Sequence, residues 1–194
     1  MSKINLGILG GGQLGSMLAT AAKKLNVQTF IYCDDENAPA QKFADDFILG
    51  DYNDENKISE FVNKVNVVTY EFENIPFNTL EFINKHKQVL PKPNINQVIQ
   101  NRFSEKNFIN NLGIKTTDYV IIKNLKDLNN NLNLLPGILK TTTLGYDGKG
   151  QFRLNNKNDI DKQKIDFSSQ YILERIINLK KEISVIITRF KNQN

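Results

Sequence analysis

Cysteine and histidine are nearly absent from this sequence. Cys33 is its only cysteine and His86 its only histidine. A single cysteine excludes an internal disulfide and a cysteine-based metal cluster, and the apolar run 27–33 predicts that the thiol is buried. His86 stands between two lysines without a partner base, acid or second histidine, so we expect it to face solvent rather than act as a catalytic base.

Long hydrophobic runs and clusters of one charge are also lacking. No stretch reaches about 18 apolar residues, the length of a membrane-spanning helix, and the start of the chain lacks the apolar segment and cleavage site of a signal peptide. We therefore expect a cytoplasmic protein with no membrane partner. The net charge is +4, but the lysines alternate with Asp and Glu along the chain. Because a nucleic-acid footprint is clustered, we expect no nucleic-acid partner.

The apolar sequence that is present alternates between strand and helix patterns. Of the 194 residues, 40% are hydrophobic, which suits one large domain or one domain and part of another. Short β-rich runs predict buried strands and helical spacing predicts amphipathic helices. In order, the expected elements of the first region are strand 4–9, helix 14–25, strand 27–33, strand 47–49, helix 54–64 capped by Asp54, strand 65–70, helix 77–85 and strand 89–90.

The first strand runs into a glycine turn, Gly10 to Gly15. The helix after it has one apolar face, formed by Leu14, Met17, Leu18, Ala21, Ala22 and Leu25. Acidic residues at 34–36 follow about 20 residues later, as in a dinucleotide-binding fingerprint. Gly12 would then admit a pyrophosphate to the helix N-terminus. A turn that only packs a strand tightly against a helix is the alternative.

Two acids, Glu71 and Glu73, come directly after the strand 65–70. Ligands of open α/β sheets bind at the carboxyl ends of the strands, so these acids are candidates for a site, with solvated loop acids as the alternative.

Pro91 and Pro93 then interrupt the pattern and predict a domain boundary. Beyond it we expect helix 95–112 ending at Gly113, strand 119–122, helix 125–132, strand 138–140, strand 151–154, helix 155–164, strand 171–173 and strand 183–188. The last strand would lack sheet partners within this chain and would expose an apolar edge.

The stretch from Lys140 to Gln151 carries three glycines and two lysines. Gly145, Gly148 and Gly150 let the backbone turn its N–H groups toward one point, and Lys140 and Lys149 add positive charge. Such a loop suits an anion. A β-hairpin with a glycine-rich turn is the alternative.

The segment Thr142-Thr-Leu-Gly-Tyr-Asp-Gly-Lys-Gly-Gln151 resembles the phosphate-covering loop of the ATP-grasp enzymes, most closely the ATP-dependent carboxylases of purine biosynthesis. Gly10-Gly-Gly-Gln-Leu-Gly15 and Glu71-Phe-Glu73 resemble the same carboxylases. The resemblance implies that the nucleotide contacts Arg102, Lys140, the loop residues Gly145, Tyr146, Asp147, Gly148, Lys149, Gly150 and Gln151, the adenine-reading linker Glu174, Arg175, Ile176 and Ile177, and Glu182 at the ribose. It further implies that the ribonucleotide contacts Gly12, Gln13, Leu14 and Glu71, its phosphate being assisted by the helix dipole, and that Tyr146 and Lys149 act at the catalytic face.

The resemblance therefore implies an α/β fold with two domains. Residues 1–93 would form a Rossmann-like substrate-binding domain, and residues 94–194 a partial ATP-grasp domain with linker helices, a lid and the first strand of the large subdomain. The reaction would be the ATP- and bicarbonate-dependent carboxylation of 5-aminoimidazole ribonucleotide. Two departures stand out: Lys149 replaces an arginine of some relatives, and no glycine precedes Glu182.

The resemblance also implies Mg²⁺ and a homodimer for the full-length enzyme. The family supplies its metal ligands from a part that follows the segment ending here, so we expect this chain alone to bind nucleotide weakly and not to turn over. Three alternatives stay open: another ATP-grasp carboxylase or ligase, a nucleotide-binding module without catalysis, and an NAD-dependent oxidoreductase, which would explain only the first 36 residues.

Overall fold

The computed structural model describes residues 4–145 and 150–188, which divide into two compact units. Unit 1 comprises the described residues up to Ile114 together with Thr142–Leu144, and unit 2 comprises Lys115–Thr141 and the described residues from Gly145 onward. Each unit has its own sheet and its own apolar core. The sequence predicts a domain boundary at residue 93. A helix begins there, at Pro93, and it belongs to unit 1.

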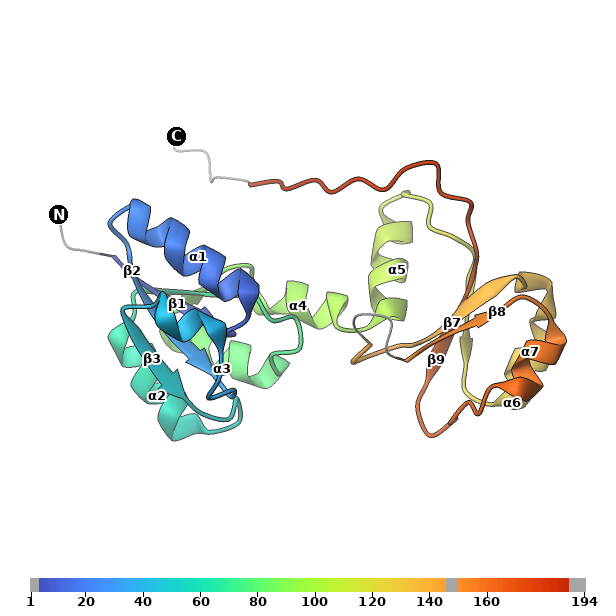
Figure 1. The fold of residues 1–194 in the computed structure, drawn as a ribbon, viewed down its shortest axis with the longest axis horizontal. Helices are drawn as coiled ribbons and strands as arrows, with labels where there is room; N and C mark the ends of the chain where they lie inside the picture. Colours follow the sequence, from blue (N-terminus) through green and yellow to red (C-terminus); the bar gives the residue numbers. More distant parts are fainter. Residues whose placement is uncertain (1–3, 146–149, 189–194) are drawn as a thin grey trace. The chain divides into compact units, whose positions relative to one another are not determined.

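Unit 1 is built on a five-stranded parallel sheet in the order β3-β2-β1-β4-β5 (Figure 1). Because parallel strands need crossover connections, helices alternate with strands along the chain. The elements are β1 (Asn5–Leu9), α1 (Gln13–Lys24), β2 (Gln28–Cys33), a 3₁₀ turn η1 (Pro39–Lys42), β3 (Asp46–Leu49), α2 (Glu55–Lys64), β4 (Val67–Tyr70), α3 (Phe77–His86), β5 (Gln88–Val89), α4 (Pro93–Ile99) and α5 (Arg102–Asn111). The predicted strands and helices of this region are confirmed, apart from the two points below.

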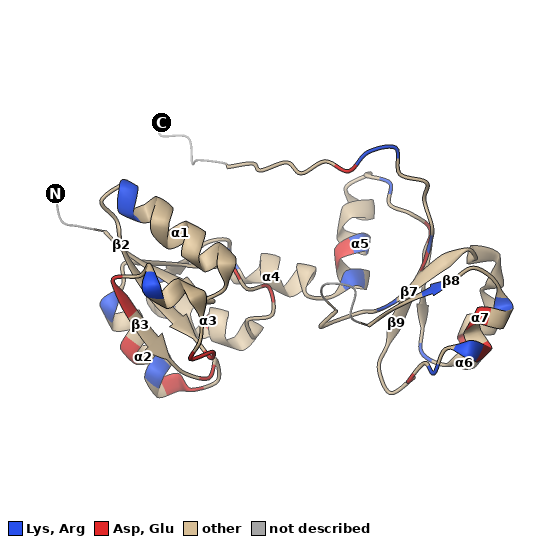
Figure 2. Ribbon diagram, viewed as in Figure 1, with Lys and Arg blue, Asp and Glu red and all other residues tan. Residues whose placement is uncertain are grey.

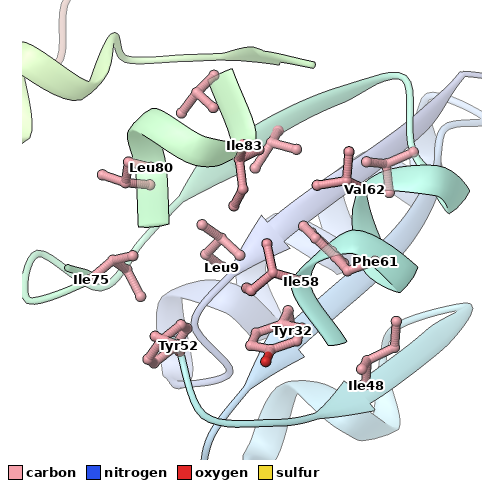
Figure 3. Close-up of a cluster of buried hydrophobic side chains, with 13 residues drawn as sticks. Leu9, Tyr32, Ile48, Tyr52, Ile58, Phe61, Val62, Ile75, Leu80 and Ile83 are labelled. Atoms are coloured by element: carbon pink, nitrogen blue, oxygen red, sulfur yellow. The ribbon is translucent and has the colours of Figure 1, made fainter. Parts of the chain in front are cut away.

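The two faces of this sheet bury different side chains. Helices α2 and α3 cover one face, where Phe61 and Ile58 of α2 meet Leu9 and Tyr32 of the strands (Figure 3). Helix α1 and η1 cover the other face, where Ile8 and Ile31 meet small side chains. Asp54 caps α2 as predicted, because its side chain accepts hydrogen bonds from the backbone N–H groups of Asn56 and Lys57. Cys33 is buried and His86 is exposed, as predicted.

Of the apolar face predicted for α1, only Ala22 is buried. Helix α1 buries Gly15, Ala19 and Ala22, whereas Leu14 and Met17 are 56% and 60% exposed. The small residues decide the orientation because the helix lies very close to the sheet: a Cβ at Gly15 would lie 2.9 Å from the carbonyl oxygen of Gly10. Helical spacing reveals that an apolar stripe exists but not which stripe the sheet can approach.

The single helix expected over residues 95–112 is two helices, α4 and α5. The break falls at Asn101, whose side chain caps α5 by accepting from the backbone N–H groups of Phe103 and Ser104. An Asn offers the backbone this local alternative to a continuous helix. Gly113 lies after the end of α5 with a φ of 78°, as its predicted C′ position requires.

Unit 2 is a four-stranded antiparallel sheet in the order β6-β9-β7-β8. It contains β6 (Tyr119–Ile122), α6 (Leu125–Asn130), a 3₁₀ turn η2 (Leu132–Leu134), β7 (Gly137–Thr141), β8 (Gln151–Leu154), α7 (Lys157–Lys162) and β9 (Tyr171–Arg175). Its core is mainly aliphatic and includes Tyr171, with Phe152 and Phe167 packed against it. The mixed α/β class predicted from the sequence is confirmed by the two sheets.

The strand predicted at residues 183–188 is wrong: residues 176–188 form neither helix nor strand. Ile183, Val185, Ile186 and Ile187 are between 69% and 94% exposed. A β-branched run favours the extended backbone, but a strand also needs a hydrogen-bonding neighbour, and the described residues provide none here.

Charged residues of both signs are interspersed over each unit (Figure 2). Among residues 4–145 and 150–188, no helix is both long and apolar enough to cross a membrane.

Candidate functional site

One candidate site lies in unit 1, at the carboxyl edge of the parallel sheet. Strands β1 and β4 are neighbours in the sheet. After β1 the chain continues to β2 on one side, and after β4 it continues to β5 on the other side. This is the switch point at which open α/β sheets bind ligands. The loops that meet there are the glycine turn after β1 and the acidic loop after β4.

At this switch point the structure brings together Gly12 and Glu71, two of the predicted ribonucleotide contacts. The Gly12 N–H donates to Glu71 Oε1 at 2.8 Å. The backbone supports this arrangement, because the Glu71 N–H donates to Leu9 O at 3.1 Å and so continues the ladder beyond β4. Gly10 has a φ of 104°, and a Cβ there would lie 2.8 Å from the same carboxylate oxygen. Only glycine fits both requirements at this position.

The other predicted residues at this edge are exposed. Gln13 and Leu14 begin α1 with solvent-exposed side chains, and Glu73 is exposed two residues after Glu71. Glu71 is half-buried, so it is the acid that the fold directs inward.

Acidic side chains also gather after strands β2 and β3 of unit 1. A pocket of about 500 Å³ lies beyond the ends of β2 and β3, where Lys57 is the one basic residue among those lining it: Asp34, Asp35, Glu36, Asn37, Leu49, Gly50, Asp51 and Lys57. The Lys57 ammonium donates to the Leu49 carbonyl at 2.8 Å. Hydrogen bonds from the backbone and side chain of Asn53 hold the pKa of Asp51 below its usual value, so this acid stays charged at neutral pH. Burial raises the pKa of the Tyr52 hydroxyl, and Cys33, Asp34 and Glu71 nearby raise it further.

A second candidate site lies in unit 2, where Lys140 and Glu174 form an ion pair. Lys140 Nζ and Glu174 Oε2 are 2.8 Å apart, and the side chains are 20% and 10% exposed. They lie on the neighbouring strands β7 and β9, whose register places Ile138 opposite Glu174 and Lys140 opposite Ile172. The pair is thus a diagonal cross-strand contact, which long side chains can make.

The predicted phosphate loop is the connection between β7 and β8. Gln151 lies opposite Lys140, and the Thr141 N–H donates to Gly150 O at 2.9 Å at the base of the hairpin. Gly150 has a φ of 68°, and a Cβ there would lie 2.7 Å from Thr141 Oγ1. Gly145 is half-buried. Of the predicted loop residues, Tyr146, Asp147, Gly148 and Lys149 lie outside the described residues.

The predicted adenine-reading linker is partly strand. Glu174 and Arg175 belong to β9. The Arg175 N–H donates to Asp118 O and the Ile176 N–H donates to Pro136 O, both at 3.0 Å. The Arg175 guanidinium also contacts Asp118 Oδ2 at 3.3 Å and Asn133 O at 2.9 Å. Ile177 follows with its side chain exposed.

Two predicted nucleotide contacts lie elsewhere. Arg102 begins α5, and its backbone N–H donates to Thr142 O at 2.9 Å. Glu182 is exposed in the segment 176–188.

Carboxylates are not grouped for a metal ion in the described part of the chain. Within residues 4–145 and 150–188, no three His, Cys, Asp or Glu side chains come together as a metal site. The described residues therefore do not fit Mg²⁺ ligation by the chain itself.

Sequence reasoning missed the partnership of Lys140 with Glu174 and the role of Asp118 in holding Arg175. Both pairings depend on strand register, for which the sequence carries no direct signal, since Lys140 and Glu174 are 34 positions apart.

Comparisons with known proteins address the whole chain. Residues 1–100 match the family model of the ribonucleotide synthetase pre-ATP-grasp domain, and residues 107–194 match the ATP-grasp domain. The N5-carboxyaminoimidazole ribonucleotide synthase of Staphylococcus aureus strain MRSA252 is 35% identical over 190 residues, which cover 96% of this chain and 51% of that protein. The bifunctional purine synthesis protein purC/E of Dictyostelium discoideum is 38% identical over 95% of this chain and 19% of its own length.

Solved structures show the same relationship. An ADP complex of an N5-carboxyaminoimidazole ribonucleotide synthetase superposes with a TM-score of 0.85 at 36% identity, covering 93% of this chain and 50% of that one. The Aspergillus clavatus synthase in complex with ADP and 5-aminoimidazole ribonucleotide gives 0.78 at 26% identity, covering 92% and 48%. The chain spans about half the length of these solved relatives. With more than half of its residues matched by the first family model, the chain belongs to the ribonucleotide synthetases that combine a pre-ATP-grasp domain with an ATP-grasp domain.

Proposed function

We propose that this chain provides the ribonucleotide-binding and nucleotide-lid regions of an ADP-forming ligase that carboxylates 5-aminoimidazole ribonucleotide with ATP and bicarbonate. The observation that carries the proposal is the Lys140–Glu174 pair at the base of the glycine loop. The pair holds the Lys140 ammonium at the base of the loop. Phosphates bound by the loop would meet this positive charge there, as at other phosphate-binding lysines. The similarity to carboxyaminoimidazole ribonucleotide synthases over nearly the whole chain supports the choice of substrates.

Each predicted residue acquires a role in this proposal. Lys140 and the loop residues 145–151 bind the phosphates, and ATP supplies the phosphoryl group that activates bicarbonate. Arg102 assists at the phosphates, and Tyr146 and Lys149 contact the reacting groups. Because the Arg175 and Ile176 N–H groups and the Arg175 carbonyl are already bonded within unit 2, the remaining backbone groups of the linker 174–177 would contact adenine. Glu182 binds the ribose hydroxyls, since a carboxylate can accept from two neighbouring hydroxyls.

In unit 1, Glu71 binds the ribonucleotide. A carboxylate held on the glycine turn accepts hydrogen bonds from hydroxyl or amine groups of the substrate. Gly12, Gln13 and Leu14 form the adjoining wall at the start of α1.

A titration followed by amide NMR tests the proposal. ATP or ADP should shift the amides of β7 and β9, and 5-aminoimidazole ribonucleotide should shift those of residues 10–15 and 71. NAD should bind more weakly than ATP. Tighter binding of NAD than of ATP, unaffected by Lys140→Ala, would contradict the proposed function and favour an oxidoreductase.

Replacing Glu182 with alanine in a full-length enzyme tests the proposed ribose contact. We expect ATP affinity to fall by about 1–3 kcal/mol, the usual loss when a charged hydrogen-bond acceptor is removed. Binding of 5-aminoimidazole ribonucleotide should stay unchanged. Lys181→Ala is the matched control, because it alters the neighbouring exposed side chain of the same segment. Equal ATP affinity of wild type and Glu182→Ala by calorimetry would show that another acid holds the ribose.

A further inference from the structure

The glycine turn after β1 already holds an anion, which is the carboxylate of Glu71. Its Oε1 accepts from the Gly12 N–H at 2.8 Å. A Cβ placed at Gly10, Gly12 or Gly15 would approach this same oxygen to 2.8, 3.2 or 3.4 Å. Three glycines of the turn therefore face one carboxylate oxygen.

This position matters because a dinucleotide would use it. In a dinucleotide-binding fold, the pyrophosphate lies against the N–H groups at the start of the first helix, and the second glycine lets the backbone approach it. Here the carboxylate of Glu71 already accepts a hydrogen bond from the Gly12 N–H. Glu71 directly follows β4, the strand that lies beside β1. A phosphate oxygen cannot form that hydrogen bond while the carboxylate stays in place.

Acidic groups after the strands β2 and β3 act in the same direction. Asp34, Asp35 and Asp51 follow these strands, and Lys57, which lines the same pocket, is engaged with a backbone carbonyl. A doubly charged pyrophosphate brought to Gly12 would meet Glu71 directly and these acids at longer range. Like charges at contact distance are strongly unfavourable in a partly buried site.

We propose that Glu71 is a specificity-determining residue that closes the glycine turn to phosphate groups and leaves it open to hydrogen-bond donors of a ligand. The turn then rejects the pyrophosphate of a dinucleotide, although its sequence resembles a dinucleotide-binding fingerprint. The phosphate of a ribonucleotide ligand must also lie away from the Gly12 N–H. The inference rests on the geometry of unit 1 and does not depend on the reaction proposed above.

The test is a titration of the whole chain with inorganic pyrophosphate and with NAD, read from the amide NMR signals of Gly12, Gln13 and Leu14. The site-resolved signal separates this turn from the phosphate loop of unit 2. We expect no saturable shift in wild type. Glu71→Ala removes the carboxylate and should bind pyrophosphate at the turn at least about tenfold more tightly, since a helix N-terminus then meets the anion directly.

Two further variants sharpen the test. Glu73→Ala makes the same change in net charge two residues away, at an exposed side chain, and should behave as wild type. Glu71→Gln keeps an oxygen that can accept from the Gly12 N–H and should gain less than Glu71→Ala. Absence of pyrophosphate shifts in a folded Glu71→Ala variant would overturn the inference. So would tight binding of pyrophosphate at the Gly12–Leu14 amides of the wild-type chain, an outcome that needs no variant to fold.

Discussion

Replacing Lys140 with alanine is expected to lower the free energy of unfolding of unit 2 by about 3 kcal/mol, the scale of breaking a buried ion pair. The cause is the carboxylate left behind. Glu174 is 10% exposed and faces Lys140 across 2.8 Å, so removing the ammonium leaves a charge with little access to water. Urea unfolding followed through the amide signals of Leu139 and Leu173, both fully buried in unit 2, measures the loss.

A double variant separates stability from nucleotide binding. Replacing the pair together, as Lys140→Met with Glu174→Leu, removes both charges of the pair and should recover most of the lost stability. ATP affinity should stay low in the single and double variants alike, because each lacks the ammonium. A Lys140→Ala chain as stable as wild type would show that the pair is not effectively buried. ATP binding by the double variant at wild-type affinity would remove Lys140 from the proposed nucleotide site.

Replacing Phe61 with alanine is expected to cost unit 1 about 3–5 kcal/mol, the usual loss for a buried phenylalanine. Phe61 is fully buried between α2 and the sheet (Figure 3). Its ring lies 5.6 Å from that of Tyr32, and a Cβ at Gly7 would lie 2.6 Å from its Cζ. The backbone of β1 thus packs directly against the ring of Phe61. Because of this close packing, a small shift of one side chain could not fill the cavity that alanine would leave.

The loss should be a large fraction of the total, because domains are stable by only about 5–15 kcal/mol. Phe43→Ala is the matched control: Phe43 is 49% exposed, and its removal should change stability by less than about 1 kcal/mol. Urea unfolding monitored at buried amides of β1 and β4 gives both values. A loss below about 1 kcal/mol for Phe61→Ala would mean that the core of unit 1 repacks around the vacancy.

The sequence by itself determined the strands and α-helices of unit 1 as far as β5, and also the glycine loop between β7 and β8. These features depend on local rules. Apolar spacing, the Asp54 cap and the glycines each act within a few residues, so their consequences can be read along the chain. The resemblance to the ATP-grasp carboxylases, carried by short motifs, pointed to the family that the comparisons show.

Local rules failed where an element needed a distant partner. The run 183–188 has strand composition but no neighbouring strand among the described residues, and α1 presents to the sheet its small residues rather than its larger apolar ones. In each case the sequence shows a tendency, while close approach or hydrogen bonding to another segment decides the outcome.

Tertiary structure alone decided the pairings that define the candidate sites. Lys140 meets Glu174 because β7 and β9 pair in a particular register, and Glu71 reaches Gly12 because β4 lies beside β1. These partners are 34 and 59 positions apart. A one-residue slip in either pairing would turn the side chains to the opposite face of the sheet, so their contacts exist only in the folded arrangement.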